Sequence, residues 1–223
     1  MLGNIELQDK AYLFLKKQIL NNQLSFDEIY SASKMATDIE VSRTPMRDAV
    51  QRLAQEGLLE IVPNKGFRLV KISKEDILEA QEVRASIETF SILKRMINIK
   101  SKDSKDLLLD LEKCLKKQDQ YRKRKDPDAF AEEDLYFHQR IVESSNNKAF
   151  IQMFKKYVTQ IRRLSIHAFK ARPDRLDNTY QEHLNILQAM KSEDLSLAMK
   201  VCLAHINATL TINMSYLDSS PTK

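Results

Sequence analysis

Residues 41–59, VSRTPMRDAVQRLAQEGLL, are predicted to form one helix with an unusual first turn. Ser42 or Thr44 can serve as its N-cap. Pro45 then lies in the first turn, where a missing backbone N–H costs no hydrogen bond. The segment carries three arginines and a side that is otherwise apolar. It therefore predicts a helix with a basic N-terminal end and a buried rear face.

The arginines of this helix favour an interaction with DNA. Arg43 and Arg47 are four residues apart, so both project from one face near the N-terminus. The opposite face consists of apolar residues: Ala49, Val50, Leu53 and Leu58. Such a helix suits the major groove, where guanidinium groups bind phosphates or pair with guanine. A surface helix with solvated arginines is the alternative, and we prefer that alternative for Arg52 alone.

Two short strands follow this helix, and two further helices precede it. The predicted elements are helices over residues 6–21 and 32–39 and strands over residues 59–62 and 67–72. Ser31 or Ser33 can cap the second helix. The sequence PNKG, residues 63–66, has the chemistry of a turn between the strands. Residues 1–72 therefore predict a unit of three helices with a two-stranded wing whose tip is basic.

After Ser73 every segment has a helical pattern. The predicted helices cover residues 73–97, 105–123, 128–145, 148–170, 174–191 and 193–217. Ser73 is expected to cap the first of them, and Asp126 followed by Pro127 to start the third. We therefore expect a mainly α fold, in which residues 73–223 form an all-α antiparallel helical bundle.

The composition agrees with a helical chain of two modest domains. The chain has 223 residues with only three glycines and five prolines, which favours helices over hairpins. A net charge of +5, from 36 basic and 31 acidic residues, is compatible with a polyanionic partner. Cys114 and Cys202 form no disulfide framework. We find no run of about 18 apolar residues and no signal-peptide pattern. A cytoplasmic location and no membrane partner are therefore expected.

The stretch VSRTPMRDAVQRLAQEGLLEIVPNKGFRLV resembles the winged helix-turn-helix of GntR-type bacterial transcription regulators. The rest of the chain resembles the FCD effector-binding domain of the FadR subfamily. The resemblance implies that Arg43, Thr44, Arg47 and the wing Gly66 contact DNA. With the helix start and the wing tip added, the expected DNA-binding set is Ser42, Arg43, Thr44, Arg47, Lys65 and Gly66.

The sequence departs from the family pattern at three places. Glu40 occupies the position of the usual glycine, and NNQLSFDE replaces a Pro-Gly turn after the first helix. Ser33 or Lys34 stands where many members have an arginine. We therefore rely on Arg43 and Arg47 more than on any contact from the second helix.

Three histidines and one aspartate in the second unit have a spacing that suits a metal ion. Asp134 and His138 are four residues apart, so both project from one helix face. His183 lies nine residues before Ser192, and His205 lies thirteen after it. They stand about 13 and 20 Å from this bend. Because Cβ atoms tilt toward a helix N-terminus, the two side chains converge. Three imidazoles and one carboxylate suit zinc, nickel or another divalent transition ion.

A single histidine in a helix is more often a core residue than a ligand, and the resemblance changes this balance. Metal-binding FCD domains carry an aspartate and three histidines at matching places. The resemblance thus implies a ligand set of Asp134, His138, His183 and His205. His167 does not match a ligand position and is interpreted as a polar residue outside the set. Cys202 is interpreted as a buried structural thiol.

Three arginines are candidates for binding an anionic effector. Arg84 lies in mid-helix at a position that resembles a family arginine near the effector pocket. A surface ion pair between Arg84 and Glu88 is the alternative. Arg162 and Arg163 are adjacent, so only one of them is expected to face the interior of the bundle.

Two classes of function remain open on these residues. The first is a ligand-responsive, DNA-binding transcription regulator. It would be a repressor that binds operator DNA as a homodimer and responds to a small organic or sugar acid at the metal site. The second is a helical-bundle metalloenzyme that uses the Asp/His site, with Glu132, Glu133 or Glu182 as a base. A di-iron enzyme would show Glu-x-x-His motifs, and the sequence has none. An enzyme also gives no reason for the SRTPMR helix and the wing, so the regulator is favoured.

Overall fold

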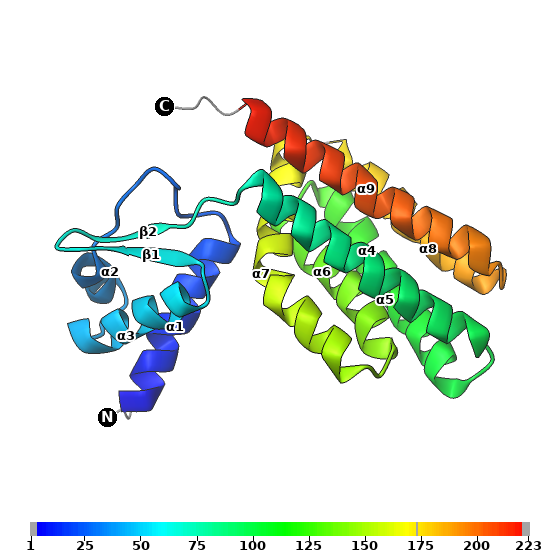
Figure 1. The fold of residues 1–223 in the computed structure, drawn as a ribbon, viewed down its shortest axis with the longest axis horizontal. Coiled ribbons are helices and arrows are strands. Elements are labelled where there is room, and N and C mark those ends of the chain that lie inside the picture. Colours follow the sequence, from blue (N-terminus) through cyan, green and yellow to red (C-terminus); the bar gives the residue numbers. More distant parts are fainter. Residues whose placement is uncertain (1–3, 173, 220–223) are drawn as a thin grey trace. The chain divides into compact units, whose positions relative to one another are not determined.

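The computed structural model describes residues 4–172 and 174–219 (Figure 1). The chain divides between Ile72 and Ser73 into two compact units. In the described residues the N-terminal unit has three helices and one hairpin, and the C-terminal unit has six helices. This is the mainly α architecture expected from the sequence.

The N-terminal unit packs its helices and its hairpin around one apolar core. Its elements are α1 (Asn4–Leu20), α2 (Ala32–Asp38), α3 (Arg43–Gln55), β1 (Leu59–Val62) and β2 (Gly66–Leu69). The two strands are antiparallel, with Leu59 opposite Leu69 and Val62 opposite Gly66. β2 ends at Leu69, so the expectation of a strand to residue 72 is wrong. Leu69 already pairs with the first residue of β1, and after the N–H of Val70 donates to Leu58 O no described strand lies opposite.

The ends of α3 determine which side chains it presents. Ser42 is the N-cap residue, although its side chain makes no capping hydrogen bond. At the other end, the N–H of Gly57 donates to Ala54 O and the N–H of Leu58 donates to Leu53 O, which is a Schellman motif. The chain therefore turns sharply from α3 into β1, and the wing follows the helix directly.

A contact from outside the hairpin fixes the wing. Tyr30, just before α2, forms an isolated bridge with Phe67, with N···O distances of 2.7 and 3.0 Å. This pairing has no signal in the sequence and was not expected. Gly66 lies beside it with a φ of +137°, and a Cβ at this position would be 2.1 Å from Tyr30 O. The glycine is therefore required by the close approach of two backbone segments.

The C-terminal unit is a bundle of six described helices. They are α4 (Lys74–Ile97), α5 (Lys102–Arg124), α6 (Pro127–Ser144), α7 (Lys148–Ala171), α8 (Arg175–Lys191) and α9 (Leu195–Ser219). Ser73 caps α4 in a capping box with Asp76, and Asp126 caps α6 with Pro127 in its first turn, as expected. α5 starts at Lys102, earlier than predicted, because Ser101 caps it. α4 packs along α9, α9 along α8, and α5 along α6 and α8 (Figure 1).

Among the described helices, α9 alone is long and apolar enough to cross a membrane, over Leu195–Ser215. No continuous apolar run of this kind was expected from the sequence. His205, Thr209 and Asn213 recur at four-residue intervals along α9 and are buried. Arg175 of α8 donates to Thr209 at 3.2 Å. A polar stripe that bonds to a neighbouring helix is typical of a helix within a bundle.

Replacing Gly66 by alanine should destabilise the N-terminal unit more than replacing Gly57. Both glycines have a positive φ, so alanine carries a backbone cost of about 1–2 kcal/mol at either position. Only at position 66 does the added Cβ also meet the Tyr30 carbonyl. Urea unfolding of the full chain, followed by circular dichroism, measures both losses. Equal losses in Gly66→Ala and Gly57→Ala would contradict the explanation by close approach.

Candidate metal centre and DNA-binding surface

The N-terminal end of α3 presents unpaired polar side chains to solvent. Arg43, Thr44 and Arg47 are exposed, and their side chains make no hydrogen bond or ion pair with any residue that the structure describes. Pro45 and Met46, between them, are buried and anchor the helix to the core. Three of the predicted DNA-binding residues are therefore available to a partner.

The other exposed edge of α3 is attached to α1. Asp48 accepts a hydrogen bond of 2.7 Å from Gln8. The guanidinium group of Arg52 lies 3.8 Å from the centre of the Tyr12 ring and 3.3 Å from Asp9 Oδ1. Arg52 thus contributes to packing within the unit, which agrees with its exclusion from the expected DNA-binding set.

A hollow of about 580 Å³ lies between α3 and the wing. It is lined by residues 31–33 at the start of α2, by Thr44, Arg47 and Gln51 of α3, and by residues 61–67 of the wing. Lys65 and Gly66 belong to this lining, whereas Ser42 and Arg43 lie outside it. Gln51 was missed by sequence reasoning, although its position four residues after Arg47 places it on the same face.

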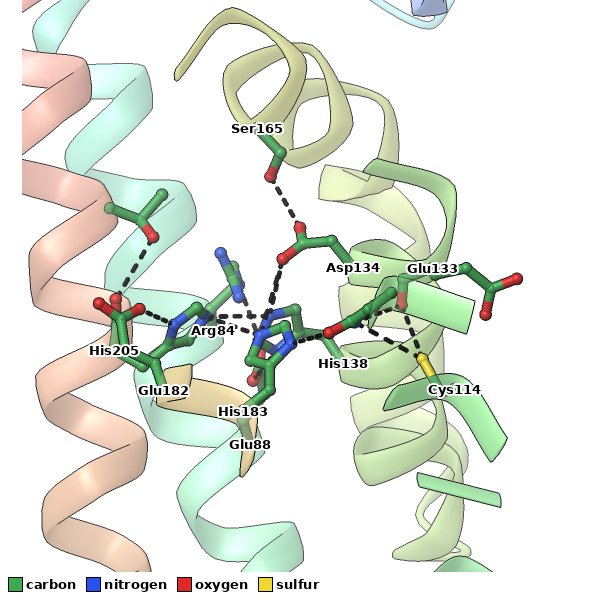
Figure 2. A network of polar contacts seen from close by, with 12 residues as sticks. Arg84, Glu88, Cys114, Glu133, Asp134, His138, Ser165, Glu182, His183 and His205 are labelled. Atoms are coloured by element: carbon green, nitrogen blue, oxygen red, sulfur yellow. Dashed lines mark hydrogen bonds and ion pairs between the residues drawn. The ribbon is translucent and has the colours of Figure 1, made fainter. Parts of the chain in front are cut away.

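Asp134, His138, His183 and His205 form one buried cluster (Figure 2). Their potential ligand atoms all lie within 4.8 Å of one another. His205 Nε2 is 3.1 Å from His138 Nε2 and 3.3 Å from His183 Nε2. Asp134 Oδ1 is 3.8 Å from His138 Nε2 and 3.6 Å from His183 Nε2. α6, α8 and α9 therefore bring together the four residues that the sequence analysis selected, and the two later histidines converge as expected.

Each member of this cluster has a polar neighbour on its outer side. His138 Nδ1 lies 2.7 Å from Glu88 Oε2. His183 Nδ1 lies 3.0 Å from Gln118 Oε1. His205 Nδ1 lies 2.6 Å from Glu182 Oε2. Asp134 Oδ2 accepts a hydrogen bond of 3.0 Å from Ser165 Oγ. The rings therefore turn their Nδ1 atoms outward and their Nε2 atoms toward the centre of the cluster.

The electrostatics around the cluster favour ionised Glu88 and Glu182 and neutral His183 and His205. Burial by itself would raise the pKa of Glu88, but His138 and Arg84 outweigh it and lower this pKa to about 2. Burial would also raise the pKa of Glu182, which its hydrogen bonds with His205 and Arg175 keep below the usual value. Burial lowers the pKa of both His183 and His205. Neutral imidazole is the form that binds a metal ion.

The donor set fits a divalent transition ion. Zinc binds imidazole nitrogen at about 2.0–2.1 Å, so two neighbouring nitrogens are separated by about 2.9 Å on an octahedral ion and about 3.3 Å on a tetrahedral one. The separations of 3.1 and 3.3 Å between Nε2 atoms lie within this range. Three nitrogen donors and one carboxylate oxygen are also ligands that zinc and nickel accept.

Arg84 lies in the interior beside this cluster (Figure 2). Its Nε donates to Glu88 Oε1 at 2.9 Å, with 1% and 0% of the two side chains exposed. Arg84 therefore does form an ion pair with Glu88, as the alternative stated, but the pair is buried and does not lie on the surface. Arg84 Nη1 contacts Gln81 at 3.4 Å, and its buried Nη2 has no hydrogen-bond partner.

Both Arg162 and Arg163 are buried, so the expectation that only one of them faces the interior is wrong. The middle of α7 has no exposed face, because residues 161–166 are all buried and the helix packs against α4, α6, α8 and α9. Arg162 pairs with Glu132. Burial lowers the pKa of Arg163 to about 10.

The remaining histidine and thiol also have defined places. His167 is half-buried and lies outside the cluster. Cys202 is fully buried in the apolar core, as interpreted from the sequence. The residues that contact the outer Nδ1 atoms of the histidines were the main feature of the site that could not be predicted from the sequence. Glu182 is adjacent to His183, whereas Gln118 belongs to a basic segment that carries no sequence signal for this role.

Known protein families match both the N-terminal and the C-terminal unit. Residues 7–69 match the family of bacterial regulatory proteins described as the gntR family, and residues 79–208 match the FCD domain. The gluconate operon transcriptional repressor of Bacillus licheniformis is 27% identical over 190 residues, 83% of this chain and 76% of that protein. The HTH-type transcriptional repressor RspR of Escherichia coli K12 is 25% identical over 203 residues, 90% and 86% of the two chains.

Solved structures share the fold. E. coli McbR/YncC superposes with a TM-score of 0.77 at 19% identity, over 97% of this chain and all (100%) of that one. The matching families and relatives are transcription regulators, which decides against the helical-bundle metalloenzyme. The FCD match alone spans more than half of the chain. The chain is therefore a DNA-binding transcription regulator that belongs to the GntR family and carries a C-terminal FCD domain.

Proposed function

We propose that this regulator is a repressor whose affinity for operator DNA is changed by a small organic acid bound at a metal site. The observation that carries the proposal is the buried Asp134/His138/His183/His205 cluster, with an incompletely paired arginine beside it. Relatives named as repressors support the direction of regulation.

The unpaired residues of α3 and the wing tip are proposed to bind DNA. Arg43 and Arg47 would enter the major groove, and Ser42, Thr44, Lys65 and Gly66 would complete the contact. One such helix reads only a few base pairs, so a homodimer on a short inverted repeat would double the length of sequence that is read.

Arg43→Ala and Arg47→Ala should each weaken operator binding by roughly 1–3 kcal/mol, about 5- to 150-fold, if each arginine reads a base. Selection from randomised duplexes with the wild-type protein supplies the operator, and gel shifts at one salt concentration measure affinity. Arg52→Ala is the matched control, because Arg52 is occupied by Asp9 and the Tyr12 ring. Unchanged affinity in both test variants would refute the assignment.

The buried cluster is proposed to hold one divalent ion, zinc or nickel. Asp134, His138, His183 and His205 would be its ligands. Because they come from α6, α8 and α9, a bound ion would tie these helices together and stabilise the folded state.

The purified protein should hold about one ion per chain, as expected for a single set of four ligands. His183→Ala and His205→Ala should each lower the occupancy and the melting temperature, because each removes a ligand from a different helix. His167→Ala, outside the cluster, is the control. Elemental analysis and thermal unfolding measure the two effects. A folded preparation that holds no metal and takes up neither zinc nor nickel would defeat this part of the proposal.

The effector is proposed to be a small hydroxy or sugar acid. Four protein ligands leave positions open on an octahedral ion, and a carboxylate oxygen can fill them. Arg84 offers its unpaired Nη2 close to the cluster, and Arg162 or Arg163 could neutralise further negative charge. The effector would alter DNA binding through a difference in its affinity for two arrangements of the protein.

Calorimetric titration with gluconate, and with other hydroxy acids, should give binding to the metal-loaded protein and none to the metal-stripped protein. A typical coupling of about 1–3 kcal/mol predicts a change of about 5- to 150-fold in operator affinity when the acid is present. Acetate serves as the control for a carboxylate without hydroxyl groups. Equal binding with and without metal would show that the acid does not coordinate the ion.

A further inference from the structure

The three histidines can each adopt two neutral tautomers, and only one of them offers an Nε2 lone pair to an ion. The positions of the hydrogen atoms follow from what each Nδ1 contacts. This inference concerns the residues that select the tautomer, and it rests on the proposed metal site.

Ionised carboxylates face two of the rings. Glu88 Oε1 accepts a hydrogen bond of 2.9 Å from Arg84 Nε, and its Oε2 faces His138 Nδ1; both Glu88 and His138 are fully buried. Glu182 accepts two hydrogen bonds, of 2.6 and 2.7 Å, from Arg175 as well as facing His205 Nδ1. An ionised carboxylate accepts hydrogen bonds and donates none. His138 and His205 must therefore carry a hydrogen on Nδ1.

A neutral amide selects the tautomer of the third ring. Gln118 Nε2 donates to Glu133 O at 3.1 Å and contacts Cys114 Sγ at 3.6 Å. These contacts fix the amide so that its Oε1 faces His183 Nδ1 at 3.0 Å. An amide oxygen only accepts, so His183 also carries its hydrogen on Nδ1.

We propose that Glu88, Gln118 and Glu182 are positioning residues that hold all three imidazoles as Nδ1–H tautomers. The three Nε2 lone pairs then point at one another across 3.1 and 3.3 Å, beside the Asp134 carboxylate. This arrangement repels itself unless a cation lies between the lone pairs. The outer hydrogen bonds therefore prepare the site for an ion before the ion arrives.

Gln118 offers the cleanest test, because it is neutral and is bonded to no arginine. Gln118→Met removes the acceptor with little change in volume, and Gln118→Glu restores one. Gln81→Met is the matched control, since Gln81 is a buried glutamine that contacts Arg84 and no histidine ring. Gln118→Asn, which withdraws the amide oxygen but remains polar, is the second variant if Gln118→Met does not fold.

Long-range ¹H–¹⁵N correlation spectra of the metal-stripped full chain report the tautomer of each histidine directly. There are only four histidines, and His167→Gln identifies the one outside the cluster. The wild type and Gln81→Met should show Nδ1–H for His183. Gln118→Met should lose this preference, and Gln118→Glu should regain it.

Zinc affinity, measured by competition with a chelator, is the second readout. Gln118→Met should bind zinc about 10- to 100-fold more weakly than the wild type, with Gln118→Glu closer to the wild type and Gln81→Met unchanged. An unchanged His183 tautomer, or an unchanged zinc affinity, in Gln118→Met would overturn the inference. A wild type that shows the Nδ1–H tautomers but binds no zinc would instead refute the metal site on which the inference rests.

Discussion

The buried ion pair between Arg84 and Glu88 is the interaction on which the interior of the C-terminal unit depends. Charged groups inside a bundle are costly unless every one is paired. Glu88 meets this condition through Arg84 on its own helix and His138 on α6. A second carboxylate, Glu182, does so through Arg175 and His205. Four helices, α4, α6, α8 and α9, must therefore align within hydrogen-bonding distance, which apolar packing alone would not demand.

The N-terminal unit is instead held together by an apolar core. α3 buries one face and divides its exposed face between two uses. The edge with Asp48 and Arg52 is bonded to α1 and holds the helix in place. The side chains of Arg43 and Arg47, on the other edge, make no bond to any described residue. Because α3 is held on one side, its backbone is already fixed where it would meet a partner, so binding has to order the two arginine side chains but little backbone.

Features that depend on neighbouring residues or on one bend could be predicted from the sequence, whereas contacts between distant segments could not. The helix cap at Ser73 and the convergence of His183 and His205 followed from spacing and helix direction, because both depend on residues close in sequence or on one bend. The burial of both Arg162 and Arg163 did not follow, since the rule that a helix buries one face fails where neighbours surround it. The contact of Gln118 with a histidine 65 residues away has no sequence signature at all.

The order of the ligands along the chain has a consequence for biosynthesis. Residues 134 and 205 are separated by 71 positions, and α4 packs on α9, the last described helix. A nascent chain therefore cannot assemble the proposed ion site until His205 has been translated, or cover α4 until α9 has been translated. The N-terminal unit has its own core and needs only residues up to Ile72. It can fold first, while the ribosome is still adding the bundle, so the unit proposed to bind DNA is folded before the unit proposed to regulate it.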